Sequence, residues 1–518
     1  MLIVTAEQMR ELDRLTIQRY GVASLTLMER AGENIAAAIL KHFGRNARRG
    51  VIVVAGKGNN GGDGFVVARL LKKKRIPCEV VMLARQDELS PDAAHNLRAF
   101  LKLKGKVTEL ATGNLAFLSQ RLRKNSLIVD AILGTGMKNA VRGLFADAIA
   151  LMNAANLPIV AVDIPSGLNT DSGAPLGVAI QAEMTVALGY PKLGQVIHPG
   201  LNFVGALVVA DIGIDPRAVA AVAPRTELLE REPVSRLVPR RKADSHKGTY
   251  GHVLVCAGSR GKTGAAILAC RAAMRSGAGL VTLAAPRSLN AIFATSLVEV
   301  MTEPLGENSR EEMAALSDDE WHRLLERKNA FLFGPGIGVN DATQNALRWL
   351  LRNLDMPWVI DADGLNNLAL ELNRLRRART APILTPHPGE MARLIGKDTA
   401  AVNADRVGIA RSFAIEHRCH LVLKGARTVI ASADGKVFIN PTGNPGMASG
   451  GMGDVLAGML TALLGQGLSA EDAMKLGVYW HGFAGDRVAA AQSEIGLIAS
   501  DIIDHLPAAL TALAAQIS

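Results

Sequence analysis

The chain has 518 residues, a length that predicts two large domains rather than one. Hydrophobic residues make up 49% and charged residues 20%, a globular balance that argues against extended disorder, and only 4% aromatic residues argues against a binder of single-stranded nucleic acid. The formal net charge of +10 is scattered, and its densest runs, 72–75 and 240–242, are expected to be a solvated helix end and a linker rather than polyanion sites.

The cysteines and the N-terminal residues bear on location. The four cysteines are dispersed and lack the C-x-x-C spacing of a redox or zinc site, so we expect reduced, buried thiols. The first residues lack the basic start and apolar stretch of a signal peptide. No apolar run reaches the roughly 18 residues that span a bilayer. These patterns predict a soluble, cytoplasmic protein that binds neither nucleic acid nor a membrane.

The first part of the chain alternates strand-like runs with helix-length segments. An amphipathic segment over 5–40 is expected to supply helices that pack on a sheet. The predicted strands cover 51–56, 78–83, 126–131, 158–163 and 183–188. This alternation is typical of an α/β fold with a mostly parallel sheet. We place the first domain at 1–216 and a linker at 217–247, because four prolines and many charges interrupt the pattern between 215 and 247.

A glycine cluster over 59–64 follows the first of these strands and precedes a predicted helix. In a strand, glycine loop and helix of this kind, backbone amides can approach a phosphate or another anion. The cluster lacks the G-x-G-x-x-G order of a dinucleotide fingerprint, which disfavours a plain NAD-dependent dehydrogenase.

Two aspartates, Asp130 and Asp163, each close a predicted strand next to glycine or serine. Such carboxylates can bind a hard cation or move protons, although either one alone could simply cap a helix. Their occurrence with Asn60, Asp63 and Ser166 around one sheet edge favours a functional site. Lys192 follows another strand and could pair with a phosphate or transfer protons, but a surface lysine is the default interpretation.

A second α/β alternation is predicted over 248–518. Its predicted strands cover 252–258, 279–284, 330–334, 357–361, 382–385 and 420–424. The segment 258–265 looks like a P-loop at first sight, but only two residues separate its first two glycines where the Walker pattern needs four. His387 lies between prolines, where a rigid turn with a polar tip is favoured over a metal ligand.

The most informative stretch is the glycine run 443–454, which ends in Asp454 just before an apolar segment, 455–464, that is predicted to be a helix. Amides at a helix start can face a phosphate, and Asp454 could then take a proton from a hydroxyl that attacks phosphorus. A glycine-rich turn with an ordinary first-turn aspartate is the alternative. The segment 424–428 offers a cation and amides at a strand end, as expected for a nucleotide phosphate.

Together these motifs resemble a two-domain family, the bifunctional NAD(P)H-hydrate repair enzymes, over nearly the whole chain. The first half is similar to the NAD(P)H-hydrate epimerase domain through 59–63, 130–136 and 163–167. The second half resembles the ADP-dependent (S)-NAD(P)H-hydrate dehydratase through the motifs 258–265, 334–338, 385–390, 424–428 and 450–454.

The resemblance implies a Rossmann-like three-layer domain followed by a ribokinase-like α/β domain. It implies an enzyme that epimerises the R and S forms of NAD(P)H hydrate and dehydrates the S form at the expense of ADP, giving AMP, phosphate and NAD(P)H. Potassium (K+) is implied as a cofactor held by Asn60, Asp130 and Ser166. Magnesium (Mg2+) is expected from the phosphoryl-transfer chemistry, and a homo-oligomer is expected.

The resemblance also places the binding residues. The hydrate is expected in the first domain near Asn59, Asn60, Gly61, Gly62, Asp63, Gly134, Thr135, Gly136, Met137, Lys138, Asn139, Ala140 and Asp163. In the second domain it is expected near Ala265, Gly338, His387 and Asp454, and the nucleotide near Lys424, Gly425, Ala426, Arg427, Thr428 and Gly453. Asp454 is the predicted catalytic base of dehydration, Asp163 the leading proton-transfer residue of epimerisation and Lys192 a lesser candidate.

One rival remains open at this stage. A small-molecule kinase, such as a vitamin-precursor kinase with a non-catalytic N-terminal binding module, would use the same glycine run and aspartate. A kinase accumulates a phosphorylated product, whereas a repair enzyme releases phosphate. The choice between ADP and ATP is not encoded in any motif of the chain.

Overall fold

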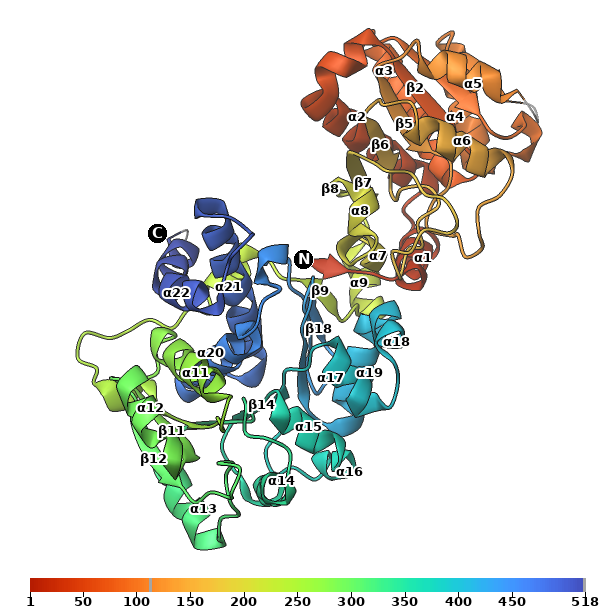
Figure 1. The fold of residues 1–518 in the computed structure, drawn as a ribbon. Helices are drawn as coiled ribbons and strands as arrows, with labels where there is room; N and C mark the ends of the chain where they lie inside the picture. Colours follow the sequence, from red (N-terminus) through yellow and green to blue (C-terminus); the bar gives the residue numbers. More distant parts are fainter. Residues whose placement is uncertain (111–113, 516–518) are drawn as a thin grey trace. The chain divides into compact units, whose positions relative to one another are not determined.

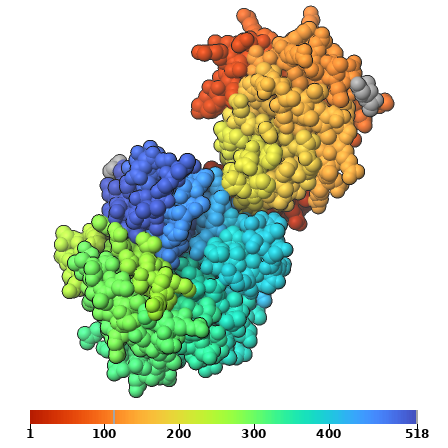
Figure 2. Space-filling view, viewed as in Figure 1, coloured from red at the N-terminus to blue at the C-terminus, as the bar shows by residue number. Residues whose placement is uncertain are grey.

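The computed structural model describes residues 1–110 and 114–515, which form two compact units. One unit is Leu2–Arg225, and the other holds Met1 and begins again at Thr226. In Figures 1 and 2 the first unit is coloured from red to yellow, and the second continues through green to blue. The structure confirms the predicted fold class, because each unit is an α/β structure built on a largely parallel sheet.

The segment predicted as a linker, 217–247, contains regular elements. Helix α9 (Pro216–Val222) packs Ala218 against the core of the first unit. Strand β9 (Thr226–Leu228) pairs in parallel with β18 (Val437–Ile439), and helix α10 (Arg231–Ser235) follows it. The division between the units therefore falls at a single point, after Arg225, inside that segment.

The first unit has a seven-stranded parallel sheet with the order β4-β3-β2-β5-β6-β7-β8. Its strands are β2 (Val51–Ala55), β3 (Cys78–Met82), β4 (Lys106–Glu109), β5 (Leu127–Ala131), β6 (Ile159–Val162), β7 (Met184–Leu188) and β8 (Ala206–Ala210). The chain runs outward from β2 to β4 and then returns to β5 beside β2. This reversal is a topological switch point, the place where open α/β sheets bind ligands.

Helices cover both faces of this sheet (Figure 1). The covering helices are α2 (Ser24–Arg49), α3 (Asn59–Lys73), α4 (Pro91–Lys102), α5 (Leu115–Leu122) and α6 (Leu144–Asn153). The unit also contains α1 (Ala6–Arg14), α7 (Leu193–Val196) and α8 (Leu201–Val204). Strand β2 explains the three layers, because side chains alternate along a strand. Val51 and Val53 pack in a core with α2, α3 and α4, while Ile52 and Val54 pack in a second core with α5 and α6.

The second unit has a mixed sheet with the strand order β9-β18-β17-β16-β15-β14-β13-β10-β11-β12. Its other strands are β10 (His252–Cys256), β11 (Leu280–Pro286), β12 (Met301–Leu305), β13 (Ala330–Phe333), β14 (Trp358–Ile360), β15 (Ile383–Leu384), β16 (His420–Leu423) and β17 (Val429–Ala431). Neighbouring strands pair in parallel along β12-β11-β10-β13-β14-β15-β16. Strand β17 pairs antiparallel with both β16 and β18. A switch point lies between β10 and β13.

One face of the second sheet packs against α11 (Thr263–Arg275), α20 (Met452–Gly465), α21 (Ala470–Ala491) and α22 (Ala499–Ala514). Helices α11 and α20 approach closely at Gly458, where an added Cβ would lie 2.1 Å from the carbonyl oxygen of Ala269. The remaining helices are α12 (Asn290–Ser296), α13 (Asp318–Leu325), α14 (Asp341–Asn353), α15 (Asp363–Ala369), α16 (Leu372–Leu375), α17 (Pro388–Ile395), α18 (Thr399–Ala404) and α19 (Arg406–His417).

Two further expectations concern cysteines and membranes. All four cysteines are free, Cys78 half-buried and the other three buried, as expected of structural thiols. Within 1–110 and 114–515, no helix is both long and apolar enough to cross a bilayer.

Candidate active sites

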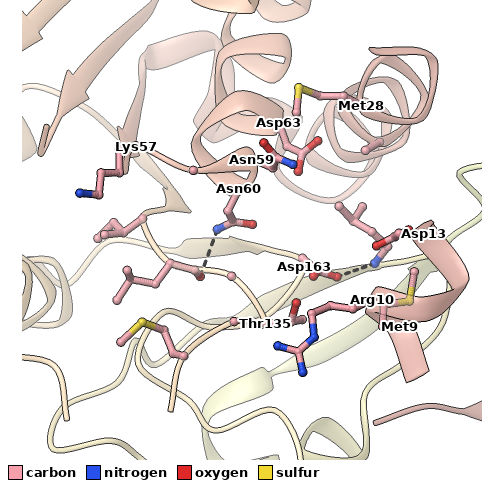
Figure 3. Close-up of a pocket in the computed structure, with 18 of the residues that line it drawn as sticks. Met9, Arg10, Asp13, Met28, Lys57, Asn59, Asn60, Asp63, Thr135 and Asp163 are labelled. Atoms are coloured by element: carbon pink, nitrogen blue, oxygen red, sulfur yellow. Dashed lines mark hydrogen bonds between the residues drawn. The ribbon is translucent and has the colours of Figure 1, made fainter. Parts of the chain in front are cut away.

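A cavity of about 760 Å³ opens in the first unit at the carboxyl ends of its central strands. Helix α1, the start of α3 and the segment after β5 contribute its walls (Figure 3). Of the residues predicted to bind the hydrate, the cavity is lined by Asn59, Asn60, Asp63, Gly134, Thr135, Gly136, Met137, Ala140 and Asp163. The structure therefore gathers most of this predicted set around one space, at the switch point between β2 and β5.

The other members of that set lie elsewhere. Gly61 and Gly62 are buried in the first turn of α3 and are not among the lining residues. An added Cβ on Gly61 would lie 2.1 Å from the carbonyl oxygen of Gly56, so this glycine lets α3 approach the end of β2. Lys138 and Asn139 are also absent from the cavity wall.

Asp130, Ser166 and Asn60 converge beneath the cavity on the peptide of Leu133. The fully buried carboxylate of Asp130 accepts hydrogen bonds from the hydroxyl of Ser166 at 2.6 Å and from its backbone N–H at 2.8 Å. The Ser166 hydroxyl in turn accepts the N–H of Leu133 at 2.9 Å, and the Asn60 amide donates to the Leu133 carbonyl at 3.1 Å. Burial raises the pKa of Asp130 to about 6, although the bonds from Ser166 oppose that rise.

Asp163 and Lys192 form an ion pair at the edge of the cavity. The Lys192 side chain is fully buried and donates from its Nζ to Asp163 and, at 3.0 Å, to the carbonyl of Leu188. The backbone N–H of Leu188 donates to the same Asp163 carboxylate at 2.9 Å. Asp163 has a φ of +64°, a left-handed conformation that aspartate and asparagine tolerate better than other residues with a side chain. Lys192 is thus no surface lysine, and its partner is a protein carboxylate.

Two more carboxylates, Asp13 on α1 and Asp63 on α3, line the same cavity. The pKa of Asp13 is raised to about 6, mainly by burial and also by the negative charge of Asp163, while the charge of Lys192 opposes both. Burial also raises the pKa of Asp63, and the charges of Asp163 and Asp13 act in the same direction. The sequence analysis did not single out Asp13, because it is one acidic residue of an amphipathic helix.

The second site lies at the start of α20. Gly451 adopts a left-handed φ of +88° at the N-cap, and the helix predicted over 455–464 runs from Met452 to Gly465. Asp454 is therefore in the first turn of the helix, where backbone N–H groups have no partner within the helix. Gly453 leaves space beside Lys424, whose Nζ would lie 3.0 Å from an added Cβ. The predicted catalytic aspartate and the predicted nucleotide-binding lysine thus lie close together.

Lys424 connects Asp454 to a network of other polar groups. Its Nζ donates to Asp361 at 2.8 Å and lies 3.9 Å from Glu390, while the Thr385 hydroxyl donates to Asp361 at 2.7 Å. The pKa of Lys424 is raised, because the carboxylates of Asp361 and Glu390 outweigh burial, which alone would lower it. Lys424 thus has Asp361 as its hydrogen-bonded partner.

The pKa of Asp454 is raised to about 7. The largest cause is burial, and the negative charge of Asp361 adds to it, while the charge of Lys424 opposes both. A carboxylate with a pKa near neutrality is suited to take up and release a proton at physiological pH. This is the electrostatic property that a catalytic base at this position requires.

Arg406 makes hydrogen bonds to the backbone of the predicted nucleotide segment 424–428 and of the residue before it. Its guanidinium donates to the backbone carbonyls of Leu423 and Lys424, each at 3.0 Å, and to that of Ala426 at 2.5 Å. Burial lowers the pKa of Arg406 to about 10. Because these carbonyls already accept hydrogen bonds from Arg406, we expect the backbone geometry of the segment to be fixed before a ligand binds.

One of the positions predicted to contact the hydrate in the second unit, Gly338, is bonded to Asp363. Gly338 donates its N–H to Asp363 at 3.0 Å, and Lys262 pairs with the same carboxylate at 2.8 Å. Ala265 lies in α11 just after Lys262. His387 is half-exposed and caps α17, with its Nδ1 accepting the N–H groups of Gly389 and Glu390. The rigid-turn interpretation of His387 therefore describes its local structure.

Several residues of this site carry no motif that the sequence analysis used for ligand binding. Asp361 follows a strand and Glu390 lies in the first turn of a helix, and what joins them is that both lie near the Lys424 amine. Arg406 bonds only backbone carbonyls in this network, so no partner side chain marks it in the sequence. Structure was needed to find these three.

Two family models match the chain. The model described as YjeF-related protein N-terminus matches residues 24–194, and the model described as NAD(P)H-hydrate dehydratase matches residues 253–508. Each match falls within one of the two compact units. The two models therefore divide the chain as its structure does.

Curated relatives match the chain over its whole length. It is 45% identical to the bifunctional NAD(P)H-hydrate repair enzyme Nnr of Moorella thermoacetica, over 100% of this chain and 98% of that protein. It is 36% identical to the Escherichia coli enzyme of the same name, over 97% of this chain and 92% of that protein. Among solved structures, the ADP/ATP-dependent NAD(P)H-hydrate dehydratase from Bacillus subtilis, co-crystallised with ATP and Mg2+, is 31% identical with a TM-score of 0.48, covering 55% of this chain and 98% of that one.

Proposed function

Since the chain belongs to the family of bifunctional NAD(P)H-hydrate repair enzymes, we propose that its first unit interconverts the R and S hydrates and that its second unit dehydrates the S form. The dehydration consumes ADP and gives AMP, phosphate and NAD(P)H. The observation that carries the proposal is Asp454 in the first turn of α20, a half-buried base with a pKa of about 7 behind a glycine run.

The chemistry of the second unit follows from the leaving group. The hydroxyl of the hydrate is a poor leaving group, and phosphorylation converts it into a good one. Asp454 takes the hydroxyl proton as the oxygen attacks phosphorus, and the amides of 451–453 stabilise charge on the transferred phosphoryl group. Lys424 contributes positive charge beside the nucleotide. Phosphate then departs as the neighbouring ring carbon loses a proton, which restores the dihydronicotinamide double bond.

The first unit supplies the other half of the repair. A chiral pocket accepts one hydrate epimer, so the R form has to be converted before it can be dehydrated. We assign proton transfer in this conversion to Asp163, whose carboxylate is held against the cavity by Lys192 and the N–H of Leu188. The Lys192 side chain is fully buried and forms an ion pair with this carboxylate.

Potassium and magnesium fit the two sites differently. Asn60, Asp130 and Ser166 gather amide, carboxylate and hydroxyl oxygens beneath the cavity, a hard-oxygen set that suits K+ and whose buried charge a cation would balance. In the second unit, Mg2+ is expected to bind with the nucleotide phosphates and one or two carboxylates. Among the described residues no group of three or more His, Cys, Asp or Glu side chains is arranged to hold a metal ion.

We also propose that the enzyme works in the cytoplasm. Its four free cysteines suit a reducing compartment. The homo-oligomeric state stays a prediction.

Recovery of the dihydronicotinamide absorbance from mixed hydrate epimers tests the proposal. The purified protein is supplied with magnesium, potassium and either ADP or ATP. Complete recovery that requires nucleotide demonstrates both activities and identifies the phosphoryl donor. Recovery of the S form alone would remove the epimerase from the proposal. A phosphorylated product that accumulates without recovery would instead establish the small-molecule kinase.

A further inference from the structure

Asp13 lines the cavity of the first unit and lies on helix α1, which contains none of the recognised motifs. Helix α1 buries Met9 and Leu12, and Asp13 lies four residues after Met9, on the same face of the helix. Both Met9 and Asp13 line the cavity. Figure 3 shows Asp13 and Asp163 reaching toward this space, one from α1 and the other from the end of β6. Both carboxyl groups therefore face the space in which a substrate ring would bind.

The substrate chemistry requires two proton-handling groups. Protonation of an enamine leaves positive charge on the carbon bonded to nitrogen, so the added hydroxyl of the hydrate sits on that carbon. The R and S forms differ there. In inversion, the ring nitrogen lone pair forms a C=N bond as the C–O bond breaks, and the hydroxyl leaves as water after accepting a proton. Water then adds to the opposite face, gives up a proton and returns the lone pair to nitrogen. No oxidant or reductant is needed.

The charges around Asp13 divide these two tasks. Asp163 accepts a hydrogen bond from the Lys192 amine. For Asp13, burial together with the charge of Asp163 raises the pKa to about 6, so it holds a proton more strongly than an ordinary aspartate. The remaining charged groups on the cavity wall are Arg10, Lys57, Asp63, Asp92 and Arg142. Of these, Asp63 adds negative charge from the facing helix α3.

We propose that Asp13 is the second acid–base residue of the epimerase site, giving a proton to the leaving hydroxyl while Asp163 takes one from the entering water. In the reverse direction the two residues exchange roles. This inference rests on the proposed function. It extends that function to a residue of α1.

The test compares Asp13→Asn with Glu11→Gln in the full-length protein. Glu11 lies on the same helix, but its carboxylate is bonded to Arg14 and is not part of the cavity wall. Each variant is given the pure R hydrate or the pure S hydrate, with ADP and magnesium. We expect Asp13→Asn to slow R turnover by roughly 10²-fold or more and to leave S turnover unchanged, because acid–base catalysis contributes on that scale. Glu11→Gln should alter neither.

The pH profile separates a chemical role from a structural one. An acid of pKa about 6 makes the R-epimer rate fall as pH rises through that value, because the proton to be donated is lost. Asp13→Asn should abolish this descending limb, and Asp13→Glu, which keeps an ionisable carboxyl, should retain a limb. Rapid R turnover in Asp13→Asn, or a slow rate with the limb intact, would overturn the assignment. A wild-type protein that converts only the S form would contradict the epimerase proposal itself.

Discussion

The two candidate sites use the same arrangement of charges in different ways. In each, a lysine donates to one carboxylate, Lys192 to Asp163 in the first unit and Lys424 to Asp361 in the second. Another carboxylate nearby has a raised pKa, about 6 for Asp13 and about 7 for Asp454. In each site, therefore, the lysine bonds one carboxylate, and a different carboxylate beside that pair has the pKa raised toward neutrality.

The sites differ in what surrounds the carboxylate of raised pKa. Asp454 stands behind a glycine run at the first turn of a long helix, where free amides favour a phosphoryl group. Asp13 lies in a cavity that also holds Asp63, Asp92 and Asp163, where a neutral ring would add no further negative charge. The comparison explains how one chain can carry out phosphoryl transfer in one unit and water exchange at a ring carbon in the other.

The variant with the largest expected effect is Asp454→Asn, which tests whether Asp454 is the base of the second site. We expect nucleotide-dependent repair to fall by about 10²- to 10⁴-fold, because the base is lost, while epimerisation continues. The matched control is Asp341→Asn, which changes an exposed aspartate in the first turn of another helix, α14. Retained dehydratase turnover in Asp454→Asn, measured as phosphate release from the S hydrate, would remove Asp454 from the mechanism.

Asp163→Asn tests the first unit in the same way. We expect R turnover to fall by roughly 10²-fold or more and S turnover to persist. Asparagine accepts the left-handed backbone at this position, so strain is not introduced. The substitution does leave the buried Lys192 without its counter-ion, which costs on the order of 3–5 kcal/mol of unfolding free energy in such pairs.

A double variant separates chemistry from stability at this pair. Asp163→Asn combined with Lys192→Gln removes both charges, so it should regain much of the lost stability in thermal unfolding without regaining R turnover. Recovery of R turnover in the double variant would show that Asp163 matters only for folding.

Much of this comparison was predictable from the sequence. The predicted strands of both sheets are confirmed, and each is a short run of mostly β-branched or other apolar residues. Parallel strands place their carboxyl ends on one edge, and for that reason Asp130, Ser166 and Asn60, far apart in the chain, meet around Leu133. Periodicity and strand order thus carry information about the site as well as the fold.

The remainder depends on packing that local patterns do not encode. Asp13 has the sequence context of any exposed helical aspartate, and only the docking of α1 places it in the cavity. Arg406 acts through backbone carbonyls, which are the same in every sequence. Strand β9 is a short run in a proline-rich, charged segment and is held by its pairing with β18, so a linker was predicted there.

The pH dependence of the two activities sharpens the comparison. A catalytic base is active when ionised, so dehydration of the S form should rise as pH increases through about 7, the pKa of Asp454, and should be lost as pH falls below it. The R-epimer rate should instead decline above about 6 as Asp13 loses its proton. Initial rates measured on each pure epimer as the pH is varied between about 6 and 7 test the prediction. If the two rates changed with pH in the same direction, Asp454 as a base and Asp13 as an acid would be contradicted.

The smallest expected effect concerns the glycine run. An added Cβ at Gly453 would lie 3.0 Å from the Nζ of Lys424, so Gly453→Ala should push this flexible amine away from its position beside Asp361. Gly450→Ala is the matched control, because nothing lies within 4 Å of its added Cβ. We expect Gly453→Ala to raise the KM for nucleotide by about tenfold, as a displaced charge-assisted contact is worth roughly 1.5 kcal/mol, and Gly450→Ala to change it little. Since the amine is displaced and not removed, kcat should fall less than in Asp454→Asn. Equal KM values for the two glycine variants would show that Lys424 does not contact the nucleotide and serves only to set the charge of Asp361.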